Sequence, residues 1–159
     1  MNRHKSAVRQ SGSTKAFTLI ELLVVLGILG IIGALSVSSY ITESRIAAVR
    51  QAAIQMQSDL EILRSSTIRY NGNSSVVLAT GGTGYTLNIA TGGTPRVVTR
   101  TFENRVIAAR IDGSDVTYIA PLSTTNSALG LQYSFTLNGA VVYLKVIGVT
   151  GRAIFSATL

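Results

Sequence analysis

The chain has 159 residues, a length that suits one domain with an appendage better than two complete cores. Hydrophobic residues make up 47% and charged residues only 13%, so we expect a membrane segment together with a surface of uncharged polar residues. The net charge is +7. Cysteine is absent, which excludes disulfides, zinc–thiolate sites and cysteine nucleophiles. The only histidine is His4, near the N-terminus, so a domain formed by the later residues lacks the usual acid–base side chain.

The first sixteen residues form a basic segment without an apolar pattern. Arg3, Lys5, Arg9 and Lys15 are its charged residues, and no acidic residue accompanies them. Nothing in it repeats at helix or strand spacing that would let it join a core. We therefore predict that residues 1–16 are a leader outside the fold.

A long apolar run follows the leader. From Leu22 to Leu35 there is no charged or polar side chain, and with its flanks the run covers residues 17–37. As a helix it would be roughly 31 Å long, enough to cross a bilayer. We predict a membrane helix over residues 17–40, and the basic leader predicts a cytoplasmic N-terminus and an exported body.

Two ordinary explanations compete for this run. A secretory signal peptide would be cut after a small residue, for which Ser36, Val37 and Ser38 are candidates, and a plain anchor would not be cut. Neither explains Glu21, a carboxylate at the start of the apolar run. An ionisable group there costs about 2.5–3.5 kcal/mol on insertion, so it indicates a function and needs a partner.

Residues 15–22, Lys-Ala-Phe-Thr-Leu-Ile-Glu-Leu, resemble the processing site of type IV pilins and of the pseudopilins of type II secretion. The resemblance implies that a prepilin peptidase cuts between Ala16 and Phe17 and that Phe17 is then N-methylated. It implies assembly with other pilin subunits from the bacterial inner membrane, with the body in the periplasm. It also implies that Glu21 neutralises the N-terminal ammonium of a neighbouring subunit, a pairing that offsets the desolvation of both charges. The family usually carries Gly where this chain has Ala16.

The helix is expected to continue beyond the apolar run as an amphipathic segment over residues 41–70. No proline precedes Pro95, and no glycine lies between Gly33 and Gly72. Apolar residues recur at intervals of three and four, and we call this set the seam: Ile46, Val49, Ala53, Met56, Leu60 and Leu63. The charged residues of this segment, Asp59 among them, are expected off the seam. Since six positions are short for a coiled coil, we expect the body to pack on the seam.

Residues 71–159 are rich in Gly, Thr, Ser, Val and Asn and predict an antiparallel β domain. Eight runs have strand length: 75–80, 85–90, 96–102, 106–111, 116–120, 131–137, 140–149 and 152–157. The fold class is therefore α+β. The resemblance makes it a type IV pilin-like fold, in which a long N-terminal helix, half in the membrane and half packed, lies against an antiparallel sheet.

Residues near the C-terminus make the resemblance more specific. Residues 135–139, Phe-Thr-Leu-Asn-Gly, followed by a strand and then Gly151-Arg152-Ala153-Ile154, resemble the C-terminal pattern of the pseudopilin H and FimT group of minor pilins. Members of that group often end in Gly-Arg-x-Arg, a motif implicated in DNA binding in FimT. Only Gly151 and Arg152 match this motif, because Ile154 stands where the motif has its final Arg.

No pattern in the chain predicts catalysis, a cofactor or a metal. Residues 112–115, Asp-Gly-Ser-Asp, lack the bidentate glutamate of a calcium loop and predict a solvated turn. Residues 81–84, Gly-Gly-Thr-Gly, lack the following Lys-Ser/Thr and predict a flexible connection. Because no nucleophile, base and orienting group come together, we predict that the protein is not an enzyme.

One cluster of cations has two explanations. Arg96, Arg100, Arg105 and Arg110 follow each other closely, and Arg152 adds charge further along the chain. They either form a solvated face or track phosphates of DNA, with weak and salt-sensitive binding. Two functions follow: a structural minor pilin or pseudopilin, or a DNA-binding minor pilin acting in DNA uptake. The choice between a type IV pilus and type II secretion stays open.

Overall fold

The computed structural model describes residues 17–156, apart from the side chains of residues 35–38 and 156, so the predicted leader lies outside the described residues. The chain divides into two compact units, Met1–Ser39 and Tyr40–Leu159. The elements are α1 (Leu19–Tyr70), β1 (Ser74–Leu78), β2 (Gly84–Ile89), β3 (Arg96–Thr101), a short 3₁₀ turn η1 (Glu103–Arg105), β4 (Ile107–Arg110), β5 (Thr117–Ile119), β6 (Thr124–Thr125), β7 (Leu131–Leu137), β8 (Ala140–Val146) and β9 (Ala153–Ser156).

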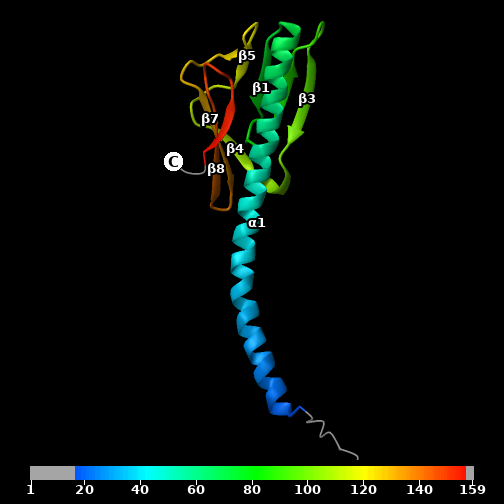
Figure 1. Ribbon diagram of the computed structural model, residues 1–159, viewed down its shortest axis with the longest axis vertical. Helices are drawn as coiled ribbons and strands as arrows, with labels where there is room; N and C mark the ends of the chain where they lie inside the picture. The colour runs from blue at the N-terminus through cyan, green and yellow to red at the C-terminus, as the bar shows by residue number, and fades with distance from the viewer. Residues whose placement is uncertain (1–16, 157–159) are drawn as a thin grey trace, which may run out of the picture. The chain divides into compact units, whose positions relative to one another are not determined.

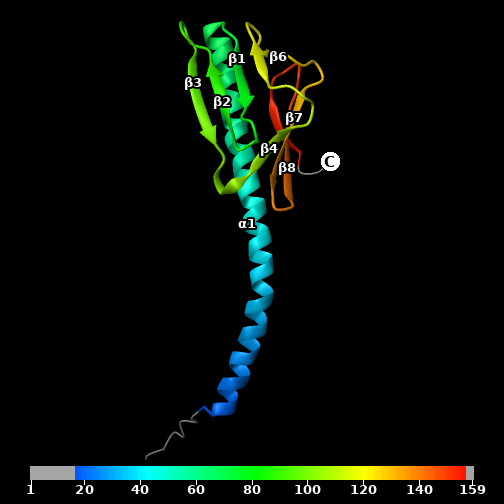
Figure 2. The ribbon, with the colours of Figure 1, turned by 180° about the vertical axis from the view of Figure 1, so that it is seen from behind.

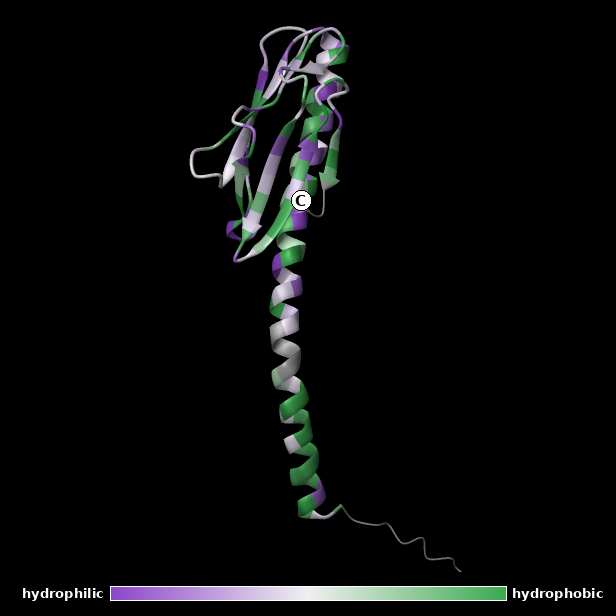
Figure 3. Cartoon of the chain, turned by 90° about the vertical axis from the view of Figure 1, so that its left-hand side faces the viewer, coloured by the Kyte–Doolittle hydropathy of each residue, from purple (hydrophilic) through white to green (hydrophobic). Residues whose placement is uncertain are grey.

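The first unit contains the N-terminal part of α1. This part is almost uninterruptedly apolar, as the colouring in Figure 3 shows. Its large hydrophobic side chains are exposed all round, from Leu19 to Ile32. Among the described residues, α1 is the one helix long and apolar enough to cross a membrane.

The second unit begins with the C-terminal part of α1, which the absence of proline and glycine keeps helical. The helix ends where Asn71 adopts a positive φ of 49° just before Gly72, a common way to close a helix. Arg69 in the last turn suits the negative end of the helix dipole. The seam packs onto the body as expected: Val49, Ala53, Met56, Leu60 and Leu63 are fully buried.

Two antiparallel sheets cover the seam. We call them sheet A, with strand order β3-β2-β1-β5-β6, and sheet B, with order β4-β7-β8-β9. Figures 1 and 2 show β1, β2 and β3 beside the helix, with β7 and β8 completing the body. Tyr85 and Leu87 of sheet A and Tyr133, Phe135 and Leu144 of sheet B meet the seam in one core. This arrangement confirms the predicted fold class.

Residues 81–84 lead from β1 into β2 of sheet A and also contact β4 of sheet B. The carbonyl of Gly82 accepts a hydrogen bond from the N–H of Ala108 at 2.8 Å, and the carbonyl of Thr83 accepts one from the N–H of Phe102 at 2.9 Å. Gly82 has a φ of +70°, and a Cβ on it would collide with the carbonyl oxygen of Ala108. Glycine at position 82 therefore permits close contact between the backbones of this connection and of β4.

Candidate functional site

The N-terminal end of α1 holds Glu21 in a capping box. The backbone N–H and the hydroxyl of Thr18 both donate to Oε2 of Glu21 at 2.9 Å, and the N–H of Glu21 lies 3.3 Å from Oγ1 of Thr18. This reciprocal Thr-x-x-Glu pattern satisfies N–H groups that the first helical turn leaves without partners. The carboxylate of Glu21 is therefore fixed by its own turn.

The surroundings of Glu21 are exposed and apolar. A shallow hollow is lined by Phe17, Ile20, Glu21, Val24 and Val25. The side chain of Phe17 is 80% exposed, whereas Ala16 lies outside the described residues, so the predicted cleavage and methylation remain predictions. In the described part of the chain, nothing covers this surface, and its burial requires a bilayer or other helices.

Asp59 forms a buried polar cluster that the sequence did not reveal. It was expected off the seam, but its residue exposure is only 5%. The hydroxyl of Tyr85 donates to Oδ2 of Asp59 at 2.7 Å, and Nε of Arg100 lies 3.4 Å from the same oxygen. Burial, followed by the neighbouring Asp59 carboxylate, raises the pKa of Tyr85 well above its ordinary value. The cluster joins α1 to β2 and β3.

A second ion pair joins the two sheets. Nη2 of Arg110 lies 2.7 Å from Oδ2 of Asp115 and donates to the carbonyl of Leu78 at 3.0 Å. The N–H of Leu78 donates to Oδ1 of Asp115 at 3.1 Å. The turn predicted over residues 112–115 is exposed at Asp112, Gly113 and Ser114, whereas Asp115 is partly buried because Arg110 of β4 and Leu78 of β1 both bind its carboxylate. Among the described residues, no three His, Asp or Glu side chains gather as metal ligands would.

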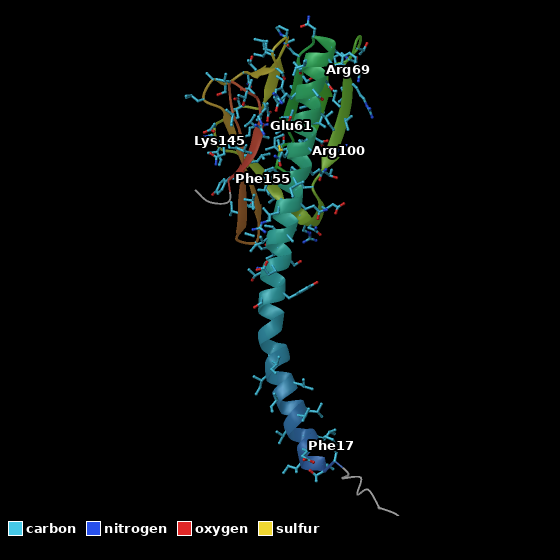
Figure 4. All side chains as sticks on the ribbon, in the orientation of Figure 1. Phe17, Glu61, Arg69, Arg100, Lys145 and Phe155 are labelled. Carbon is cyan, nitrogen blue, oxygen red and sulfur yellow. The ribbon has the colours of Figure 1, made fainter. Side chains whose placement is uncertain are left out.

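The structure disperses the predicted arginines. Arg96 and Arg100 lie on β3 at the edge of sheet A, Arg105 lies in η1, and Arg110 and Arg152 lie on or beside strands of sheet B. Arg100, labelled in Figure 4, and Arg110 are engaged in the two ion pairs. Arg96, Arg105 and Arg152 are exposed and belong to none of the ion pairs found among the described residues.

Comparison with known proteins gives one family motif and two related structures. Residues 12–37 match the prokaryotic N-terminal methylation motif. The fold is similar to that of the type IV minor pilin FimU of Pseudomonas aeruginosa in two crystal forms. One has a TM-score of 0.55 at 18% identity and covers 68% of this chain and 87% of FimU; the other has a TM-score of 0.53 at 16% identity and covers 67% and 91%. No curated protein matches the chain.

A methylation motif ahead of a long helix that packs against an antiparallel sheet defines the class of pilin-fold proteins with an N-terminal processing signal. The chain therefore carries this motif and has a fold similar to that of the minor pilin FimU, in agreement with the resemblance found in residues 15–22.

Proposed function

We propose that the protein is a structural minor pilin or pseudopilin. In this proposal, residues 1–16 are a leader that a prepilin peptidase removes between Ala16 and Phe17, and Phe17 is then methylated. Residues 17–40 anchor the chain in the bacterial inner membrane with the N-terminus cytoplasmic. Residues 41–70 carry the periplasmic body, 71–159, on the seam. The proposal includes membership of the pseudopilin H and FimT group. It covers both possible assemblies, a type IV pilus and a type II secretion pseudopilus.

One observation carries this proposal. The N-terminal part of α1 exposes apolar side chains on every side and places a single carboxylate, Glu21, among them. A helix that is apolar all round is buried in a membrane or among other helices. A carboxylate that enters such surroundings needs a positive partner, and the N-terminal ammonium of another processed subunit supplies one.

The test has two parts. The intact mass and N-terminal sequence of the protein from its host's membranes should show a chain that begins at methylated Phe17. Next, Glu21→Gln should be processed and retained in the membrane but lost from the sheared filament or pseudopilus fraction. Glu43→Gln, on the same helix beyond the apolar run, is the matched control and should assemble normally. A mature chain that begins near Ser39 contradicts the proposal.

DNA binding is a second proposal, now narrowed to three arginines. The exposed guanidinium groups of Arg96, Arg105 and Arg152 support it, because they are outside the ion pairs that engage Arg100 and Arg110. We expect the full chain in detergent to shift a DNA fragment at low salt, and charge reversal at these three positions to abolish the shift. Charge reversal at Glu43, Glu103 and Asp112 should strengthen it. An unchanged shift in the arginine variant contradicts this proposal.

A further inference from the structure

The β3 edge of sheet A is open to solvent. Among the described residues, β3 is the longest strand that ends a sheet, with six residues, whereas β6 has two and β4 and β9 have four each. The edge of β4 is partly covered, since the N–H of Ala108 donates to the carbonyl of Gly82. No described strand pairs with β3 on the side away from β2, and Figures 1 and 2 show β3 at the margin of the body. An open edge of this kind can accept another strand.

The pairing pattern shows which backbone groups of β3 are free. The N–H of Phe102, the residue after β3, donates to the carbonyl of Thr83 at 2.9 Å. Backbone groups alternate in direction along an antiparallel strand, so every second residue before Phe102 also points its groups toward β2. The N–H and carbonyl groups of Val97, Thr99 and Thr101 therefore point to the open edge. Within the described part of the chain, no hydrogen bond engages them.

The side chains of β3 alternate between the two faces of sheet A. Arg100 reaches Asp59 of α1, and Val98 packs against the core, so these two residues face the helix. Arg96 follows the same alternation and lies on the same face, about 13 Å from Arg100 along the strand. The opposite face of β3 carries only valine and threonine. All the charge of the strand is therefore on its helix-facing side.

The charge along β3 favours an acidic partner. Arg96 is exposed and belongs to none of the ion pairs found among the described residues. The side chain of Arg100 is 48% exposed and only its Nε lies near a carboxylate, so its other N–H donors remain available. Glu103 is the one acidic residue between positions 96 and 110. A second copy of β3 would bring two more guanidinium groups to the same face, whereas an acidic strand would be attracted to it.

We propose that β3 binds an extended acidic segment of a partner protein by strand addition. The segment bonds to the open backbone groups of β3 and continues the antiparallel order of sheet A. Two acidic residues four positions apart lie opposite Arg96 and Arg100, with an apolar residue between them opposite Val98. These are non-hydrogen-bonded pairs, with Cα atoms about 4.5 Å apart, where side chains come closest. The proposal is independent of whether the protein assembles as a pilin.

A capped, fluorescein-labelled peptide with the sequence Thr-Glu-Thr-Val-Thr-Glu-Thr has this pattern and is the probe. We expect it to bind the full chain in detergent, measured by fluorescence anisotropy, about tenfold more tightly than the same peptide with lysine in place of glutamate. N-methylation of the two threonines beside the valine removes the N–H groups that face β3 and should abolish binding. N-methylation of the valine, whose N–H faces away from β3, should leave the affinity unchanged. These comparisons leave the protein itself unaltered.

Variants of the protein test the same surface from the other side. Arg96→Glu should weaken the binding of the acidic peptide about fivefold, whereas Lys145→Glu, an equal change of charge at an exposed position of β8, should not. Thr99→Pro removes an N–H at the open edge without breaking a bond to β2 and should abolish binding. Thr99→Ala keeps that N–H and should bind the peptide like the parent.

Three results would overturn the proposal. The acidic peptide could fail to bind, or it could bind equally well when its two central threonines are N-methylated. Sedimentation could also show that the parent chain self-associates and that Thr99→Pro abolishes the association. The edge would then be occupied by a second copy of the chain and not by an acidic partner.

Discussion

Two carboxylates on one helix show how differently its two parts are stabilised. Glu21 is satisfied by Thr18, three residues away in the same turn. Asp59 is satisfied by Tyr85 and Arg100, which are 26 and 41 residues further along the chain. The first arrangement can be read from a short motif, and the second exists only when the body has folded.

The same contrast holds for the apolar side chains around them. Leu26 is 58% exposed, whereas Leu60 is completely buried. The N-terminal part of α1 depends on surroundings outside the chain, and the C-terminal part depends on two sheets of the same chain. The stability of the body should therefore respond to substitutions in the C-terminal part and not to equivalent substitutions in the N-terminal part.

The largest difference is expected for leucine. Leu60→Ala should lower the free energy of unfolding by about 2–5 kcal/mol, because it leaves a cavity between the seam and the sheets. Leu26→Ala should leave the stability of the body unchanged, since its side chain contributes nothing to that core. Urea unfolding of the full chain in detergent, followed by tyrosine fluorescence, measures both. Equal losses would show that the two parts are not independent.

A smaller effect is expected at Asp59. Asp59→Ala leaves the buried hydroxyl of Tyr85 without its acceptor and should cost about 1–3 kcal/mol. Arg100 adds little, because its side chain is 48% exposed and water can replace the lost carboxylate. Asp59→Asn keeps an oxygen acceptor and should cost less. The same urea titration checks the order, and an Asn variant as unstable as the Ala variant would show that the negative charge is essential.

The smallest expected effect is a dependence of the stability of the second unit on pH. Burial raises the pKa of Tyr85, Tyr118 and Tyr133 well above the ordinary value near 10. The folded form keeps these phenols neutral while the unfolded chain ionises, so stability is constant well below pH 10 and falls as the pH rises through 10. The loss is about 0.4 kcal/mol for each tyrosine at pH 10. Phenolate absorbance that rises together with unfolding would confirm this, and Tyr118→Phe should weaken the dependence.

Much of the fold could be predicted from local patterns. The absence of proline, and of glycine between Gly33 and Gly72, predicted that the helix continues beyond the apolar run. Its 3–4 spacing predicted the buried seam, and turn residues predicted most strands. The two-residue β6, Thr124–Thr125, was missed because so short a strand has no alternation to detect. The division into two sheets was not predicted either, since it depends on which strands pair, and strands such as β1 and β5 or β4 and β7 are distant in the sequence.

The burial of two acidic residues could not be predicted from the sequence. Asp59 comes three residues after Met56 and four before Leu63, a spacing that suits the buried face of the helix, but as a charged residue it was expected off the seam. Only its partner Tyr85, distant in the chain, makes that burial favourable. In the same way, the sequence predicted Asp115 to lie in a solvated turn, whereas in the structure Arg110 and the backbone N–H of Leu78 bind its carboxylate. A local pattern indicates which face a residue occupies, whereas a distant partner decides whether a charge there is tolerated.

The close contact at Gly82 also decides where an epitope tag can be placed in the body. An insertion at residues 81–84 would separate the carbonyl of Gly82 from Ala108 and uncouple the two sheets. Gly93, between β2 and β3, and Gly113, after β4, have open space around them and can accept extra residues. A tag at Gly93 would therefore make the body detectable without disturbing the junction between the sheets.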